Sequence, residues 1–121
     1  MPKQVLIVDD CAVTRKLVAL YLKKAGFGSV QAENGLEALE KLAQELVDLV
    51  VTDLNMPRMD GLALTKSLRS EPQYARLPIV MLTTEAEETA RAKGLEAGVS
   101  AYLTKPVTQE RLDEVVQTLT A

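Results

Sequence analysis

Three short, almost continuously apolar segments restrict the fold of this chain more than any other feature of its sequence. They are residues 5–8, 49–51 and 79–82. Strands that are covered on both faces of a parallel sheet have this composition, because neither face meets water. Residues 29–32 and 100–103 are shorter or more polar and have the character of edge strands. The sequence therefore predicts a sheet with three central strands and two outer ones.

Five helix candidates alternate with these strands, which is typical of βαβ units with helices on both faces of a parallel sheet. Right-handed connections and the two edge assignments together favour the strand order 2-1-3-4-5, a doubly wound α/β fold. The winding direction reverses between the first and third strands. With 121 residues, 47% of them apolar, the chain has the size of one domain, residues 1–121, without a linker or repeat.

Helix ends are marked by capping residues and by glycines. Two pairs have the spacing of an N-cap residue and a carboxylate that reaches back to it, namely Asn34 with Glu37 and Thr84 with Glu87. Gly26 and Gly98 follow helical stretches, at positions where a left-handed cap favours a residue without Cβ.

Two helices carry apolar stripes that we expect to face the sheet. The stripes consist of Leu36, Leu39, Leu42 and Leu46, and of Leu112, Val115, Val116 and Leu119. The fourth helix, roughly residues 85–97, differs because its apolar residues are mostly alanines and because Gly94 costs about 1 kcal/mol relative to alanine. Small side chains bury little area, so this helix is either a weakly anchored, movable element or an ordinary surface helix.

Charged residues stand where several of the predicted strands end. Asp9 and Asp10 follow the first strand, Asp53 closes the third, and Lys105 follows the fifth. Ligands of open parallel sheets bind at the carboxyl ends of the strands, so these side chains should meet there. Three acids repel one another unless a cation lies among them, and their oxygens suit a hard divalent ion such as Mg²⁺. Asp9 and Asp10 would hold this ion directly or through water, unless one of them only caps the first helix.

The residues at these strand ends could carry out phosphoryl chemistry. Asp53 is the candidate nucleophile, because a carboxylate oxygen can attack a phosphoryl donor and form an acyl phosphate. Lys105 would pair with the carboxylates at rest and with the phosphoryl oxygens afterwards, and the Thr83 hydroxyl could donate to one of those oxygens. Asn55 could add its backbone carbonyl to the metal ligands. Taken singly, each of these residues also has an ordinary structural interpretation. Asp53 could be a turn aspartate, Lys105 a surface lysine and Thr83 a β-branched strand residue.

Composition argues against several functions. A net charge of −3 and a pI near 5.0 are unfavourable for nucleic-acid binding. The apolar segment after residues 1–3 is too short for a signal peptide or a membrane span, so we expect a cytoplasmic protein. The chain has no histidine, so a partner must supply any histidine that the chemistry needs. We expect Cys11 to be a small, partly buried residue beside the site, with redox sensing as the alternative.

Four motifs occur together in a specific order. They are Asp9-Asp10 after an apolar strand, Asp53 in DLNMPRMDG, Thr83 after IVML, and Lys105-Pro106. Together they resemble the receiver domain of two-component response regulators, in particular the stand-alone CheY-like proteins. The resemblance covers essentially the whole chain and implies a flavodoxin-like, CheY-like fold with no effector domain. It also implies that the chain catalyses only its own phosphorylation and dephosphorylation.

The resemblance implies roles for the residues at the strand ends. Asp53 corresponds to the phospho-acceptor, and Asp9 and Asp10 correspond to the acids that bind Mg²⁺ with it. Asn55 corresponds to the residue whose backbone carbonyl completes the metal site. Lys105 corresponds to the lysine of the family, and the peptide bond between it and the following proline is commonly cis in family members.

The resemblance further implies a switch and its partners. Thr83 corresponds to the hydroxyl that moves toward the phosphoryl group, and Tyr102 to the aromatic residue that turns inward in the active form. Asn55 and Glu85 occupy the positions that tune phosphoryl lifetime, and this pairing favours rapid dephosphorylation. A sensor histidine kinase or histidine phosphotransfer protein would supply the phosphoryl group. A partner would read the fourth helix, fifth strand and fifth helix, and we expect a monomer that contacts neither nucleic acid nor membrane.

Two other functions fit the same sheet less well. A metal-dependent phosphatase would need a cap insertion or long loop to enclose its substrate, and a flavin- or nucleotide-binding module would need a glycine-rich phosphate loop. The sequence carries neither feature. It leaves open whether the output is a chemotaxis-type contact with a motor, a phosphorelay or a phosphate sink, and it does not identify the kinase.

Overall fold

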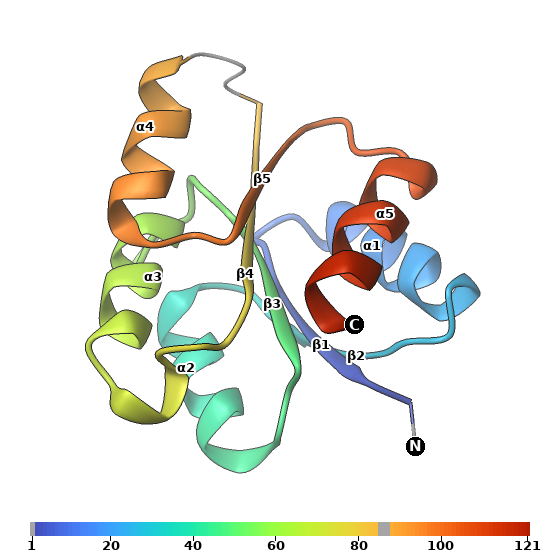
Figure 1. The fold of residues 1–121 in the computed structure, drawn as a ribbon, viewed down its shortest axis with the longest axis horizontal. Coiled ribbons are helices and arrows are strands. Elements are labelled where there is room, and N and C mark those ends of the chain that lie inside the picture. The colour runs from blue at the N-terminus through green and yellow to red at the C-terminus, as the bar shows by residue number, and fades with distance from the viewer. Residues whose placement is uncertain (1, 85–87) are drawn as a thin grey trace.

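The computed structural model describes residues 2–84 and 88–121. Its strands form one parallel sheet in the order β2-β1-β3-β4-β5, which confirms the predicted fold (Figure 1). The strands are β1 (Gln4–Val8), β2 (Gly28–Ala32), β3 (Leu49–Asp53), β4 (Ile79–Thr83) and β5 (Ala101–Thr104). The helices are α1 (Ala12–Lys24), α2 (Gly35–Gln44), α3 (Gly61–Arg69), α4 (Glu88–Ala97) and α5 (Gln109–Thr120), with a short 3₁₀ helix, η1 (Pro72–Tyr74), after α3.

Helices cover both faces of the sheet, and each face has its own apolar core. Helices α1 and α5 lie on one face, whereas α2, α3 and α4 lie on the other (Figure 1). Side chains alternate along β1, so Val5 and Ile7 enter the core beneath α1 and α5, and Leu6 and Val8 enter the opposite core. Every residue of β3 and β4 is buried, as their apolar sequences predict. Each fully buried large apolar side chain contributes about 1.5–3 kcal/mol.

The carboxyl ends of the central strands lie side by side at one end of the sheet. In the parallel register, Val8 lies opposite Thr52, and Asp53 lies opposite Leu82. Strand β1 pairs with β2 on one side and with β3 on the other, so the winding reverses at this point. The residues that follow β1 and β3 therefore gather at the same end of the molecule.

Most of the predicted helix ends are confirmed. The Asn34 side chain accepts a hydrogen bond from the Glu37 backbone N–H at 2.9 Å and so caps α2. Gly26 and Gly98 have φ values of +92° and +105°, as expected of left-handed caps. The predicted pair of Thr84 and Glu87 includes a residue outside the described part of the chain.

The apolar stripe predicted for α5 is confirmed, but the stripe predicted for α2 is partly wrong. Leu112 and Val116 are fully buried, and Val115 and Leu119 pack against the same core. Around α2 the sheet buries Ala38 and Leu42, with Leu39 packed beside them. Leu36 is 38% exposed, because Ala38 lies four residues before Leu42 and takes the inward position on the helix. Leu46 is 96% exposed, because α2 ends at Gln44.

Candidate acidic site at the carboxyl end of the sheet

Three carboxylates meet at the end of the sheet, as the sequence predicts. Oxygen atoms of Asp9, Asp10 and Asp53 all lie within 4.8 Å of one another. Asp9 and Asp53 are buried, with 1% and 8% of their surface exposed, whereas Asp10 is exposed. Such a donor set is all oxygen and formally carries three negative charges, which fits a hard divalent cation such as Mg²⁺.

Asp9 makes polar contacts through both its carboxylate and its backbone carbonyl. Its Oδ1 accepts the backbone N–H of Cys11 at 2.8 Å, and its Oδ2 accepts the Lys105 ammonium at 2.9 Å. Its backbone carbonyl accepts the Arg15 Nη1 at 2.7 Å. The carboxylate therefore has a fixed orientation, and it is Asp9 rather than Asp10 that binds an amide at the start of α1. The N-cap residue itself is Cys11.

Lys105 bridges the two buried acids. Its Nζ lies 2.9 Å from Asp9 Oδ2 and 3.2 Å from Asp53 Oδ1. Burial lowers the pKa of Lys105, but hydrogen bonds and charge attraction from Asp9 and Asp53 outweigh this effect and raise it overall. The lysine therefore stays charged at neutral pH. Its backbone N–H donates to the Thr83 carbonyl at 2.7 Å, and the peptide bond to Pro106 is cis, as the family resemblance implies.

The surroundings of Asp53 disfavour the charged form of its carboxyl group. Burial raises its pKa, and the negative charge of Asp9 raises it further, while Lys105 opposes both effects. One lysine does not compensate for two neighbouring carboxylates, so a bound cation would relieve the remaining repulsion. The site thus combines a buried carboxylate with a positive charge 3.2 Å away, which is an arrangement that can receive a dianionic group.

The loop after β3 packs closely against the backbone of Asp53. A Cβ placed on Gly61 would overlap the Asp53 carbonyl oxygen, so the start of α3 requires glycine there. The side chain of Asp60 caps α3 by accepting the Ala63 N–H at 2.8 Å. Together these contacts fix the loop that contains Asn55, which is exposed.

The remaining predicted residues have different surroundings. Thr83 is fully buried at the end of β4, between β3 and β5. Tyr102 lies in the neighbouring strand β5, is partly buried and packs against the core beneath α2 and α3. Glu85 lies outside the described residues.

Cys11 is exposed, which corrects the prediction that it is partly buried. It is the N-cap residue of α1. Hydrogen bonds from the Thr14 side chain and from the backbone of Thr14 and Val13 lower the pKa of the thiol.

Arg15 is a residue of this site that sequence reasoning missed. Besides its bond to the Asp9 carbonyl, its Nε donates to the Gln31 side chain at 3.2 Å and its Nη2 lies 3.9 Å from Glu33. It thus links the acidic site to the end of β2. The available signal was its position one helical turn after Cys11, from which a long side chain reaches back to the strand end.

The chain is similar in sequence and structure to known proteins of one family. The response regulator receiver domain family matches residues 5–117. The chemotaxis protein CheY-3 of Vibrio cholerae is 39% identical over 121 residues, covering 96% of this chain and 93% of the relative. The structure of chemotaxis response regulator CheY4 of V. cholerae superposes with a TM-score of 0.92 and 35% identity, over 98% of this chain and 99% of that one.

A third relative contains a metal. The receiver domain of sensor histidine kinase PA1611 of Pseudomonas aeruginosa, solved with magnesium coordinated in its active site cleft, superposes with a TM-score of 0.91 and 26% identity, over 99% of this chain and 98% of that one.

Among the described residues of the present chain, no helix has the length and apolarity to cross a membrane. The chain belongs to the response regulator receiver domain family, whose members are signalling domains rather than enzymes.

Proposed function

We propose that this chain is a phosphorylation-activated switch in which Asp53 accepts a phosphoryl group from a phosphohistidine. The donor is a sensor histidine kinase or a histidine phosphotransfer protein, because this chain has no histidine of its own. The observation that carries the proposal is the position of Lys105, whose ammonium contacts Asp9 at 2.9 Å and Asp53 at 3.2 Å within the cluster of three acids. Residues 1–121 act together as one receiver domain, as a cytoplasmic monomer.

The transfer is a single displacement at phosphorus. A carboxylate oxygen of Asp53 forms the new P–O bond, while the P–N bond to the donor imidazole breaks and its electron pair stays on the nitrogen. Lys105 and the Thr83 hydroxyl bind the phosphoryl oxygens as they arrive. Water later hydrolyses the acyl phosphate, which releases inorganic phosphate and restores the carboxylate.

Asp9, Asp10 and Asp53 hold Mg²⁺, together with the backbone carbonyl of Asn55. When bound, the ion neutralises charge on the transferring phosphoryl group. Support comes from the oxygen-only donor set and from the related receiver domain that was solved with magnesium in its cleft.

Phosphorylation changes the surface formed by α4, β5 and α5. It replaces one negative charge on Asp53 with about two and adds oxygen acceptors. Thr83 moves toward these oxygens, and Tyr102 turns into the space that Thr83 leaves. Thr83 is the last residue of β4, and Tyr102 lies in the neighbouring strand β5 opposite Met81, two residues before the position that pairs with Thr83. Residues two positions apart point to the same face of a sheet, which supports direct coupling.

The signal is short-lived and its output is either a chemotaxis-type contact or onward transfer of the phosphoryl group. Asn55 and Glu85 stand two residues after the acceptor and after Thr83, and the resemblance to the receiver family implies that residues at these positions tune the rate of hydrolysis. The similarity to a chemotaxis protein favours the first output, in which a partner binds the surface of α4, β5 and α5.

Intact mass after incubation with Mg²⁺ and a small acyl-phosphate donor tests the acceptor. We expect a single phosphoryl adduct on the wild type that is absent from Asp53→Asn and from a chelator-treated sample. Asp113→Asn is the matched control, because this acid lies on α5, where it accepts the Gln109 amide at 2.9 Å. An adduct on Asp53→Asn, or none on the wild type after rapid quenching, contradicts the proposal.

Thr83→Ala tests the coupling. We expect the adduct to form nearly as well as in the wild type, while the chemical-shift changes of α4, β5 and α5 with beryllofluoride become smaller. Thr83→Ser keeps the hydroxyl and should respond like the wild type. Full shift changes in Thr83→Ala would show that the hydroxyl does not couple the site to this surface.

A further inference from the structure

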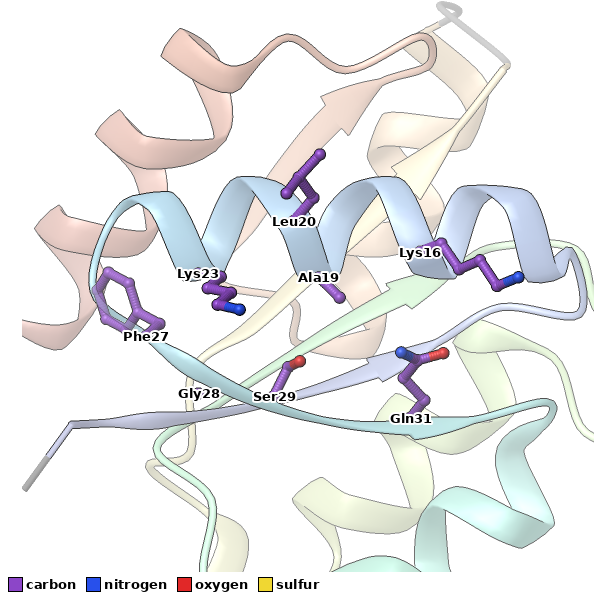
Figure 2. Close-up of a pocket in the computed structure, with 8 residues that line it drawn as sticks. All are labelled: Lys16, Ala19, Leu20, Lys23, Phe27, Gly28, Ser29 and Gln31. Carbon is purple, nitrogen blue, oxygen red and sulfur yellow. The ribbon is translucent and has the colours of Figure 1, made fainter.

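A groove runs between α1 and β2, and none of the three acids of the acidic site lines it. Its volume is about 460 Å³, and its walls come from α1, from the turn that follows it and from β2 (Figure 2). Figure 2 shows Ser29 and Gln31 pointing from β2 toward α1, and Lys23 extending from α1 toward β2. Phe27, the one phenylalanine of the sequence, lies at one end and is partly buried.

The groove has a local charge opposite to that of the whole chain. Two exposed lysines of α1, Lys16 and Lys23, line it, and none of its lining residues is acidic. The chain as a whole has a net charge of −3. Glu33, which follows β2, lies 3.9 Å from Arg15 and is thereby partly neutralised. An acidic ligand would thus find complementary charge here rather than on the protein at large.

The groove also contains apolar surface. Leu20 is 47% exposed, although it lies between the two lysines on α1, and Ala19 lines the same wall. Leu20 and Ala19 provide a site where an apolar side chain could be buried between the two positive charges, and Phe27 extends this apolar surface at one end of the groove.

One wall of the groove is the edge of the sheet. Strand β2 ends the strand order, so no strand of the described chain pairs with its outer side. The Gly28 N–H donates to the Lys3 carbonyl, and the Ala32 carbonyl accepts the Asp9 N–H, so both residues face β1. By the alternation of a parallel pair, the N–H and C=O groups of Ser29 and Gln31 face outward and can bind an added strand.

We propose that this groove binds an extended acidic segment of a partner protein, which adds to the outer edge of β2 and directs acidic side chains to Lys16 and Lys23. The spacing fits this occupant. The two lysines are seven residues apart on a helix, or about 10.5 Å along its axis. Side chains four residues apart on one face of a strand are about 13 Å apart, which flexible lysines can reach. The residue midway between them faces Leu20.

The occupant is a protein segment because the site combines strand hydrogen bonding with only two positive charges. A membrane surface or a nucleic acid would require a larger positive surface, and neither uses the outward amides of a strand. The proposal does not depend on phosphorylation, so the unmodified chain is suitable for its test.

The probe is a labelled synthetic peptide with the core glutamate-threonine-leucine-threonine-glutamate, flanked by threonines. Fluorescence anisotropy measures its affinity for the full chain, and amide chemical shifts locate its site. We expect shifts in α1 and β2, and at least tenfold weaker binding to the double variant Lys16→Glu, Lys23→Glu. The matched control, Lys66→Glu with Lys93→Glu, changes the charge equally at exposed lysines of α3 and α4 and should bind as the wild type does.

Two control peptides test the binding mode. A peptide with lysine in place of glutamate should not bind. In the second peptide, every other backbone amide is N-methylated, so that the edge that meets β2 cannot donate hydrogen bonds. This peptide should bind at least tenfold more weakly. The proposal is overturned if the peptide loses the same affinity for both double variants, or if the chemical-shift changes are confined to other elements. It is also overturned if N-methylation of neither of the two alternate sets of peptide amides weakens binding. Concentration-dependent shifts of β2 without peptide would identify a second copy of the chain as the occupant, and tighter binding to anionic phospholipid vesicles than to the peptide would identify a membrane; either result also overturns it.

Discussion

Helices α4 and α5 both flank β5, but the sheet holds them in different ways. Helix α5 places Leu112 and Val116 fully in the core. Within residues 92–97, the part of α4 whose side chains the structure describes, Gly94 and Ala97 are buried, while Leu95 is 58% exposed. A helix that buries leucine and valine gains several times the apolar area of one that buries glycine and alanine. Of the two helices on the proposed output surface, we therefore expect α5 to be the fixed element and α4 to be the one that can move at low cost.

The two helices also differ in what fixes their ends. The loop before α5 begins with Lys105, which binds Asp9 and Asp53 in the acidic site. The turn after α4 is held by Arg69 of α3, whose Nε donates to the Gly98 carbonyl at 2.9 Å and whose Nη1 donates to the Tyr74 carbonyl at 2.8 Å. The end of α4 is thus held by side-chain hydrogen bonds of an arginine, whereas α5 is held mainly by buried apolar side chains.

Truncating the anchor of α5 should have the largest effect. We expect Leu112→Ala to lower the free energy of unfolding by about 2–5 kcal/mol, because it removes a fully buried side chain and leaves a cavity. Urea denaturation measures the change. Leu95→Ala, the matched truncation on the exposed side of α4, should change stability by no more than about 0.5 kcal/mol. Similar losses in both variants would show that α4 and α5 are equally anchored.

Removing the arginine at the end of α4 should have a smaller but still measurable effect. We expect Arg69→Met to cost about 2 kcal/mol, because it leaves the carbonyls of Gly98 and Tyr74 without their charged donor. Hydrogen exchange should accelerate in α4 more than in α5. Lys66→Met on the same helix, at an exposed position, is the control and should change little. Equal acceleration in α4 and α5 would argue against a local role for Arg69.

The acidic site beside the start of α5 should make stability depend on pH. The pKa of Asp53 is raised in the folded state, whereas an unfolded aspartate titrates near 3.9. The folded state therefore binds the proton more tightly, and stability falls as pH rises from about 4 through the raised pKa. Lys105 remains charged over this window, since its pKa is also raised.

Asp53→Asn should therefore be the more stable protein at neutral pH in metal-free buffer, by a few degrees in Tm. The difference should disappear toward pH 4 and should reverse when Mg²⁺ is added, because the ion stabilises the wild type more than the variant. Thermal unfolding at several pH values, with chelator or with Mg²⁺, measures both effects. A difference that is independent of pH would mean that the charge of Asp53 costs the fold nothing.

The features that the sequence predicts correctly depend on short stretches of chain. Apolar strands, the residues that end them and the glycine caps are local patterns, and the parallel topology brings Asp9, Asp53 and Lys105 together without further information. Contacts of long side chains do not follow from such patterns. Arg15 reaches the Asp9 carbonyl and Arg69 reaches Gly98 only because of how helices lie on the sheet.

The errors of prediction have similar causes. The end of α2 carries neither glycine nor proline, so the pattern extended the helix to Leu46, beyond its true end at Gln44. Ala38 was not recognised as the residue that faces the sheet, because alanine fits any side of a helix. Gly61 gave no signal of its own, since the need for glycine there arises from the backbone of Asp53 folding against it.

The smallest effect should come from filling the packed side of α4. Gly94→Ala removes a glycine from a helix interior, which favours the helix by about 1 kcal/mol. The added Cβ would lie 3.3 Å from Val99 Cγ2, so Val99 must shift by a few tenths of an ångström, and this shift offsets part of the gain. We expect a net stabilisation below about 1 kcal/mol, measured by urea denaturation, with slower hydrogen exchange in α4 and none of this slowing in α5. In a Val99→Ala background the contact is absent, so Gly94→Ala should there give the full gain. A loss of stability in both backgrounds would mean that α4 is packed as tightly as α5, because only a rigid neighbour would leave no room for a single methyl group.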